Sequence, residues 1–539
     1  MNSPAPHKFA LKLSCLYISL AVAGSTAVAA ESAAQWFSDG QQALAQSKKM
    51  QPNKKRAKNV ILFVGDGMGI STVTAARILE AQLRGQSGEE NSLSFEKLPY
   101  LALSKSYSVN QQTPDSAPTM TAMVTGVKTE DGILSVNQNV VRGDYRTVAG
   151  NELKTILEQA EEIGMSTGVV TTARLTHATP AATYAHSPER NWESDAELPA
   201  DAKAAGFPDI ARQLIEFSYG DGIEVALGGG RRYFTPNTLP DPEAPGKTGG
   251  RKDGRDLTAE WQSKYPNSAY VWNKAQFDAI DPANTKHLLG LFNSSHMEYE
   301  HDRPADVGGE PSLAEMTSKA IDMLERNKKG YFLMVEGGRI DHGHHAGNAY
   351  RALTDTIAFS EAVKAALGKV DLSDTLIVVS ADHSHTMTIG GYPTRGNPIL
   401  GKVRGNDRKG NPSATYSKDM LGLPYTTIGY ANGPGYTGAS DKQPEGAKTY
   451  PHLPSSYSGI TRGRPDLNAV DTTQPGFLQE ATVPLSSETH AGEDVAIYAD
   501  GPGAQWFRGV KEQNYIYHVM AEALKLKEKK SAARSRRWK

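Results

Sequence analysis

Short runs of consecutive apolar residues recur along the chain, and each is followed at once by glycine, carboxylate or histidine. The clearest runs cover residues 59–64, 167–172, 331–335 and 375–379, with shorter ones at 225–227 and 495–498. Apolar runs of this length, bounded by turn residues, predict buried strands. Helical patterns from residue 71 and over 315–325 and 350–367 predict helices between them. The pattern indicates α/β organisation, as one large unit with insertions or as two or three domains.

The strand predicted at 331–335 delivers polar residues at its end. Glu336 and a glycine pair follow it, and then come Asp341 and His345. Residues four apart lie on the same face of a helical turn, and a carboxylate beside an imidazole suits a divalent metal. In open α/β sheets, ligands bind at the carboxyl ends of the strands. The alternative is a solvated, histidine-rich loop.

Two other predicted strands end in the same way. Asp66 follows the strand at 59–64 between two glycines, and Asp382 and His383 follow the strand at 375–379. The glycine spacing around Asp66 does not match a dinucleotide fingerprint, and a carboxylate there would repel a pyrophosphate. We therefore interpret Asp66 as a metal ligand, the alternative being an ordinary Asp-Gly turn.

His490 is a further candidate ligand, and it lies shortly before the strand predicted at 495–498.

Ser116 is a candidate nucleophile. Pro118, early in a helical pattern, places Ser116 at or near the N-cap, where backbone N–H groups and the helix dipole favour an anion. No Gly-x-Ser-x-Gly elbow surrounds it, so activation by a metal is expected rather than by a protein base. The alternative is a plain capping serine.

The strand at 167–172 leads into His177, Thr179 and Arg190. His177 and Thr179 would reach a metal or its water, and the Arg190 guanidinium would grip two oxygens of a phosphate. The alternatives are a hydrogen-bonded turn histidine and a surface arginine.

Composition excludes several classes of protein. The net charge is -2, from 58 basic and 60 acidic residues, so no global field attracts nucleic acid. A basic start, a short apolar run and a small-residue site predict a signal peptide at 1–30, too short to span a membrane. The single cysteine, Cys15, lies inside it, so no disulfide or thiolate-ligated zinc is expected in the mature chain. No later apolar run approaches the length of a membrane span, which predicts an exported, soluble protein.

The candidate ligands together imply metal ions. Four carboxylates buried side by side would be very unfavourable without compensating cations. Histidines among oxygen ligands suit zinc in an open site, whereas oxygen ligands such as Glu336 and Thr179 suit magnesium. Two zinc ions about 4 Å apart would activate the attacking and leaving oxygens of an in-line displacement.

At these motifs the chain resembles the alkaline phosphatase family over about residues 56–525. The resemblance rests on residues 64–69, 115–117, 177–180, 186–190, 335–345, 381–385 and 489–492. It implies a large, mostly parallel sheet between helices, usually in a homodimer. Composition predicts a polar arm at 31–56, a loop-rich insertion at 390–480 that is rich in Gly, Pro, Ser and Asn, and a basic tail at 528–539, with the core at 57–389 and 481–527. The resemblance implies that the insertion is crown-like.

The resemblance also implies a role for each candidate. Ser116 forms a covalent phosphoserine, and Arg190 clamps the phosphoryl oxygens. One zinc ion is assigned to Asp341, His345 and His490, and a second to Asp66, Asp382 and His383. Magnesium is assigned to Asp66, Thr179 and Glu336.

Several positions depart from parts of the family. His177 and His342 follow the animal-type pattern rather than the Asp and Lys of well-studied bacterial members, which leaves the third metal open. The stretches Phe292-Asn293 and Glu310-Pro311 resemble a calcium site imperfectly, because Asn293 stands where a carboxylate is expected. The basic C-terminus does not match the animal enzymes' lipid-anchor signal.

The sequence thus predicts hydrolysis of phosphate monoesters at alkaline pH, in the periplasm or outside the cell. A phosphodiesterase or a sulfatase on the same metal core is the nearest alternative, although the residues after Ser116 lack the arginine of the sulfatase motif. A catalytically silent metal- or phosphate-binding protein is the alternative of another class.

Overall fold

The computed structural model describes residues 32–459 and 463–526. It separates into two compact units, one ending at Gln51 and one starting at Pro52. In the first, helix α1 (Ala33–Lys49) begins after Ser32, whose side chain accepts a hydrogen bond from the Gln35 backbone. The predicted signal peptide and basic tail lie outside the described residues.

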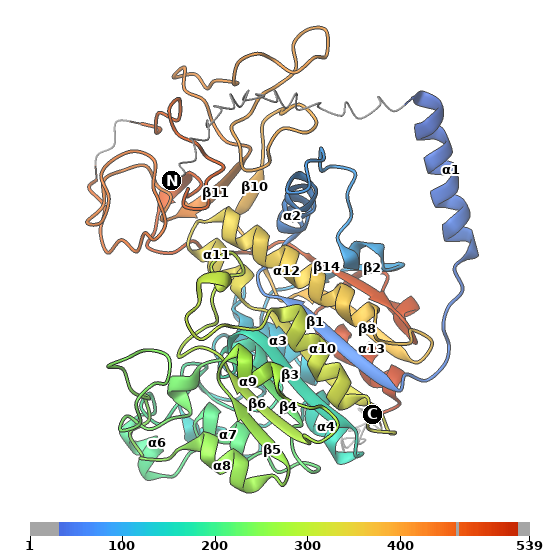
Figure 1. The fold of residues 1–539 in the computed structure, drawn as a ribbon, viewed down its shortest axis with the longest axis vertical. Helices are drawn as coiled ribbons and strands as arrows, with labels where there is room; N and C mark the ends of the chain where they lie inside the picture. Colours follow the sequence, from blue (N-terminus) through green and yellow to red (C-terminus); the bar gives the residue numbers. More distant parts are fainter. Residues whose placement is uncertain (1–31, 460–462, 527–539) are drawn as a thin grey trace, which may run out of the picture. The chain divides into compact units, whose positions relative to one another are not determined.

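The second unit is built on a ten-stranded sheet in the order β15-β2-β14-β8-β1-β7-β3-β4-β6-β5 (Figure 1). Only the pairs of β14 with β2 and β8 are antiparallel. The prediction of a large, mostly parallel sheet is confirmed. The strands are β1 (Asn59–Gly65), β2 (Tyr100–Lys105), β3 (Ser166–Arg174), β4 (Val225–Gly229), β5 (Ser268–Val271), β6 (His287–Leu291), β7 (Tyr331–Gly337), β8 (Thr375–Ala381), β14 (Val495–Asp500) and β15 (Gly509–Glu512).

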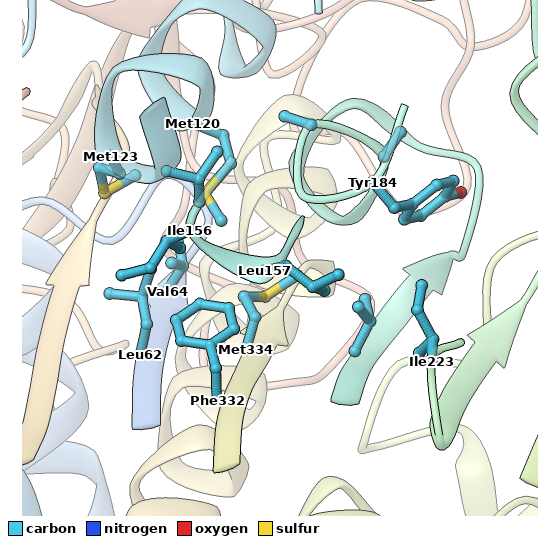
Figure 2. Packing of buried hydrophobic residues seen from close by; sticks show 14 of the residues in the cluster. Leu62, Val64, Met120, Met123, Ile156, Leu157, Tyr184, Ile223, Phe332 and Met334 are labelled. Atoms are coloured by element: carbon cyan, nitrogen blue, oxygen red, sulfur yellow. The ribbon is translucent and has the colours of Figure 1, made fainter. Parts of the chain in front are cut away.

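The central strands are apolar throughout because both faces of the sheet are covered. Leu62 and Val64 of β1 pack with Met120 and Ile156, from helices α3 and α4, on one face (Figure 2). Ile61 and Phe63 point into a second core, which contains side chains of α2, α10 and α12. The helices are α2 (Ile70–Gln82), α3 (Ser116–Thr125), α4 (Ile156–Glu162), α5 (Ala178–Ala181), α6 (Ala200–Ala204), α7 (Ile210–Ile215), α8 (Leu257–Lys264), α9 (Lys274–Asp278), α10 (Leu313–Leu324), α11 (Arg339–His345), α12 (Ala349–Leu367) and α13 (Tyr515–Leu524).

Two small sheets connect the segment around residues 390–480 to the core. Strands β10 (Met387–Ile389), β11 (Ile428–Gly433) and β12 (Ala481–Pro484) form one. Strands β9 (Ser384–His385) and β13 (His490–Ala491) form the other, which sets His490 opposite His385. Among the described residues of 390–480, β11 is the one named strand and there is no α-helix, in agreement with the loop-rich pattern.

The structure departs from the sequence pattern at α8. Residues 236–260 are rich in proline and glycine, a pattern that predicts irregular structure, but α8 begins at Leu257, where the Asp256 side chain accepts hydrogen bonds from the Thr258 and Ala259 backbone. The helix is largely polar and buries few side chains, chiefly Leu257 and Trp261, so its apolar periodicity is weak. Within 32–459 and 463–526, no helix has the length and apolar character needed to cross a membrane.

Candidate metal and phosphate site

The candidate residues lie at the carboxyl edge of four adjacent strands, in the order β8, β1, β7 and β3. Gly65 of β1 pairs with Gly337 on one side and Ala381 on the other. Asp66 and Asp382 therefore leave the sheet side by side, next to Glu336 near the end of β7. All three side chains are fully buried.

Three imidazole side chains converge on the carboxylate of Asp341. Its Oδ1 lies 3.2 Å from His345 Nε2, 3.3 Å from His490 Nε2 and 2.7 Å from His385 Nε2. Asp341 and His345 share one face of α11, as the spacing predicted. Donor atoms of all four residues lie within 4.8 Å of one another. The three residues assigned to the first zinc are thus together, joined by His385, which the sequence did not single out.

A second group of possible metal ligands lies next to Ser116. Asp66, Asp341 and His383 have donor atoms within 4.8 Å of one another. Asp382 Oδ2 lies 3.2 Å from His383 Nε2, which itself is 3.2 Å from Ser116 Oγ. The hydroxyl of Ser116 thus points at the predicted second zinc site.

A third group joins Asp66 and Glu336 to His177. Thr179, in the short helix α5, is buried, and its hydroxyl lies close enough to Glu336 to favour the charged form of that carboxyl. Both oxygen donors predicted for magnesium are present beside Asp66, with an added imidazole nitrogen.

The bonding state of these atoms fits cations. Several buried oxygen atoms that could bind a metal ion have no hydrogen-bond partner in the described chain: both Asp66 carboxylate oxygens, Asp382 Oδ2, Glu336 Oε1 and Thr179 Oγ1. Burial and the carboxylates of Asp382, Asp341 and Glu336 raise the pKa of Asp66 well above its usual value. Burial likewise raises the pKa of Glu336 to about 7. Because unpaired buried charges are costly, this edge is suited to divalent ions.

Arg190 is fixed beside the serine by two contacts. It forms an ion pair with Asp115, and its NH2 nitrogen donates to His177 Nε2 at 3.0 Å. Asp115, rather than Ser116, is the N-cap of α3, and Ser116 is the first helical residue. Asp115 also accepts hydrogen bonds from the Ala117 and Gly132 backbone. The sequence did not identify Asp115 as the positioning residue for Arg190.

The buried residues His385 and Glu488 hold Asp341 in place through a chain of hydrogen bonds. His385 bonds to Asp341 through Nε2 and to Glu488 through Nδ1. Burial opposes the charged imidazole, but Glu488 and Asp341 raise the pKa of His385 to about 10. His385 lies in the motif at 381–385, and Glu488 directly precedes the motif at 489–492. Their pairing depends on β9 and β13 coming together, and nothing in the local pattern reveals it.

The comparison with known proteins decides the family. A family model described as Alkaline phosphatase matches residues 57–526. The chain belongs to the alkaline phosphatase family. It is 45% identical to the alkaline phosphatase of Gadus morhua over 476 residues, which is 87% of this chain and 92% of that protein. It is also 45% identical to the tissue-nonspecific isozyme of Gallus gallus over 496 residues, 90% of this chain and 88% of that protein.

Solved alkaline phosphatases share the fold. The enzyme of Thermus thermophilus superposes with a TM-score of 0.60 at 26% identity and covers 89% of this chain and 94% of its own. The enzyme from the Antarctic bacterium TAB5 gives a TM-score of 0.56 at 22% identity over 88% and 100% of the two chains. The chain is therefore an enzyme of a phosphoric monoester hydrolase family, with metal-binding clusters at the expected edge of its sheet.

The calcium site predicted around Asn293 and Glu310 contains side chains that bond to each other and to the backbone. Asn293 Nδ2 donates to Glu310 Oε1 at 3.1 Å, and Glu310 Oε2 accepts from the Glu298 backbone. Glu243 and Asp306 nearby each keep one buried oxygen without a partner. Within the described residues no three of these carboxylates converge to within 4.8 Å. Calcium at these residues stays a prediction.

Proposed function

We propose that the chain hydrolyses phosphate monoesters through a phosphoserine intermediate at Ser116, with an optimum at alkaline pH. The observation that carries the proposal is the position of Ser116 Oγ, 3.2 Å from His383 Nε2 at a rim of buried carboxylates and imidazoles. Family membership supports the substrate class.

The ions belong to the proposal, because the donor sets fit them. Zinc would be held by two sets, Asp341, His345 and His490, and Asp66, Asp382 and His383, and magnesium by Asp66, Thr179 and Glu336. When bound, they supply positive charge that favours the serine alkoxide and the phosphoryl oxygens. His177 places an imidazole beside the third group, which weakens the preference for magnesium there.

The chain's own groups bind and orient the phosphoryl group. Ser116 opens a ten-residue helix, so the free backbone N–H groups and the dipole of α3 favour an anion at its hydroxyl. Arg190 presents a planar fork of donors to two phosphoryl oxygens. Its ion pair with Asp115 keeps that fork next to the serine. The oxygen of Ser116 attacks phosphorus and displaces the alcohol of the ester, and water then cleaves the phosphoserine to give inorganic phosphate and the free serine.

Replacing the nucleophile tests the proposal. Ser116→Ala should fold and bind the same metal content, but lose about three orders of magnitude or more in kcat on nitrophenyl phosphate. Wild-type enzyme quenched in acid with labelled phosphate should retain label on Ser116, and the variant should not. Turnover of the variant within tenfold of wild type would reject the mechanism. Bis-nitrophenyl phosphate and nitrophenyl sulfate serve as controls and should be much poorer substrates.

Export to the periplasm or the medium and assembly into a homodimer complete the proposal. The signal at 1–30 lies outside the described residues, and the single chain does not test the dimer. Both follow from the sequence pattern and the family resemblance.

A further inference from the structure

Next to the phosphate site lies a patch of arginine and histidine that the proposed chemistry leaves largely unused. We name it the arginine–histidine patch; it consists of Arg174, Arg190, Arg339, His177, His296 and His342. The ring centres of His296 and His342 are 4.1 Å apart, and His177 lies 5.3 Å from His296. The six residues come from the end of β3, the segments after β3 and β6, and the start of α11.

Hydrogen bonds fix which ring nitrogens carry hydrogen. Arg339 NH1 donates to His342 Nδ1 at 3.1 Å, and Arg174 donates to His296 Nε2. A guanidinium has no acceptor, so each accepting nitrogen carries a lone pair and the other ring nitrogen carries the N–H. His296 Nδ1 is therefore a donor, and it is buried without a partner in the described chain. The patch presents donors and lacks acceptors.

The positive charge of the patch is only partly compensated. Arg174 pairs with Glu193 at 2.6 Å, and Arg190 pairs with Asp115. Arg339 has no ion pair among the described residues, and its Nε is buried without a hydrogen-bond partner. Its guanidinium instead stacks 3.7 Å from the ring centre of Tyr299. One guanidinium is thus left without an ion pair, although the buried carboxylate of Asp355 lies within its electrostatic reach.

This chemistry favours an anion over a metal. Guanidinium groups repel cations, and neither His296 nor His342 belongs to any of the described groups whose donors converge to within 4.8 Å. Arg339, His296 and His342 are each partly exposed, whereas Arg339 Nε and His296 Nδ1 themselves are buried. A stacked arginine beside N–H donors is the arrangement that binds a carboxylate or a phosphate.

The patch is also connected to the reacting phosphoryl group. Arg190, the proposed phosphoryl clamp, donates to His177, whose ring lies 5.3 Å from that of His296. We infer that Arg339 and His296 form a subsite for a second anionic group of the substrate, so that phosphate monoesters carrying a nearby carboxylate or phosphate are preferred. The inference rests on the proposed function and names its substrate class.

Matched substrates test the subsite. 3-Phosphoglycerate and glycerol 1-phosphate share a three-carbon skeleton and differ in one carboxylate, and pyrophosphate carries a second phosphate instead. In Arg339→Gln and in His296→Phe, the ratio of kcat/KM for 3-phosphoglycerate over glycerol 1-phosphate should fall about tenfold from the wild-type ratio, mainly through KM, the loss expected for one charge-assisted hydrogen-bonded group. A larger fall for pyrophosphate than for 3-phosphoglycerate would assign the subsite to phosphate, and the reverse to carboxylate.

Controls separate the subsite from general damage. Arg146→Gln removes an exposed guanidinium that pairs with Asp144 and should leave the ratio unchanged. Arg339→Lys keeps the charge and should retain part of the preference. A ratio within twofold of wild type in both Arg339→Gln and His296→Phe, for both substrates that carry a second anionic group, overturns the inference. Absence of turnover of glycerol 1-phosphate by the wild-type enzyme would instead overturn the proposed function.

Discussion

At the scale of single residues, Gly67 shows how tightly the site is built. Its backbone has φ +68°, a conformation that side-chain-bearing residues rarely adopt. Its N–H donates to Asp382 Oδ1 at 3.0 Å. A Cβ at this position would stand 2.4 Å from the His385 ring, the group that bonds to Asp341. The backbone therefore passes between Asp382 and the His385 ring, where a side chain would not fit without displacing the ring.

Gly67→Ala is therefore expected to damage both stability and activity. Gly410→Ala is the matched control, because Gly410 has φ +84° and open space around its Cβ position. The control should lose only about 1 kcal/mol of unfolding free energy, from backbone strain. Gly67→Ala should lose more, and its kcat/KM should fall because His385 is displaced. Urea unfolding and steady-state kinetics check both, and equal behaviour of the two variants would contradict the close approach.

At the scale of secondary-structure elements, two helix caps have different duties. Ser312 caps α10 in a capping box with Glu315, on the surface. Asp115 caps α3 and at the same time holds Arg190 beside Ser116. The cap of α10 therefore stabilises only its own helix, whereas the cap of α3 also positions a residue of the phosphate site.

Removing each cap separates the two duties. Ser312→Ala should lower the unfolding free energy by about 1 kcal/mol and leave kinetics unchanged. Asp115→Ala should cost a similar or larger amount and also raise KM for nitrophenyl phosphate, because Arg190 loses the carboxylate that orients it. The comparison of KM between the two variants is decisive: an unaltered KM in Asp115→Ala would show that Arg190 is held in place without it.

The elements that the sequence predicted well are those whose burial is uniform. The strands at 59–64, 331–335 and 375–379 were located to within two residues, because both faces of each are covered. The edge strand β15 was missed, because its residues are exposed or half-buried and show no apolar run. Carboxylates at strand ends indicated the site, and the family resemblance supplied the ligand sets. The roles of Asp115, His385 and Glu488 depend on contacts between segments that are distant in the sequence.

At the scale of the whole molecule, the sheet supports a cluster of like charges. Asp66, Glu336, Asp341 and Asp382 are all buried at its carboxyl edge. Asp341 differs from its neighbours: burial opposes its ionisation, yet His345, His385 and His490 hold its pKa well below the usual value. The pKa values of Asp66 and Glu336 are raised, so these two groups resist ionisation unless a cation is bound.

Metal removal should make stability depend on pH with a defined sign. The folded-state pKa of Glu336, about 7, lies above its ordinary value of 4.5, and that of Asp66 is also raised. The unfolded chain therefore releases these protons at lower pH, and the metal-free fold loses stability as pH rises from about 4.5 through 7. The Tm of chelator-treated enzyme should fall between pH 6 and pH 8, and Glu336→Gln should reduce that fall.

Metal-loaded enzyme is the control for this experiment. Bound cations favour the ionised carboxylates, so its Tm should not show the same decline over that interval. Calorimetry on both forms at several pH values measures the difference. A metal-free enzyme at least as stable at pH 8 as at pH 6 would contradict the mutual repulsion of these carboxylates.

The position of His490 has a consequence for biosynthesis. The pairing of β13 with β9 sets this predicted metal ligand beside Asp341, and His490 lies far along the chain from Asp66. A nascent polypeptide whose synthesis has not reached residue 490, or an N-terminal fragment released by a protease cut within the long insertion, lacks one member of the predicted set. Such incomplete products are expected to lack phosphatase activity.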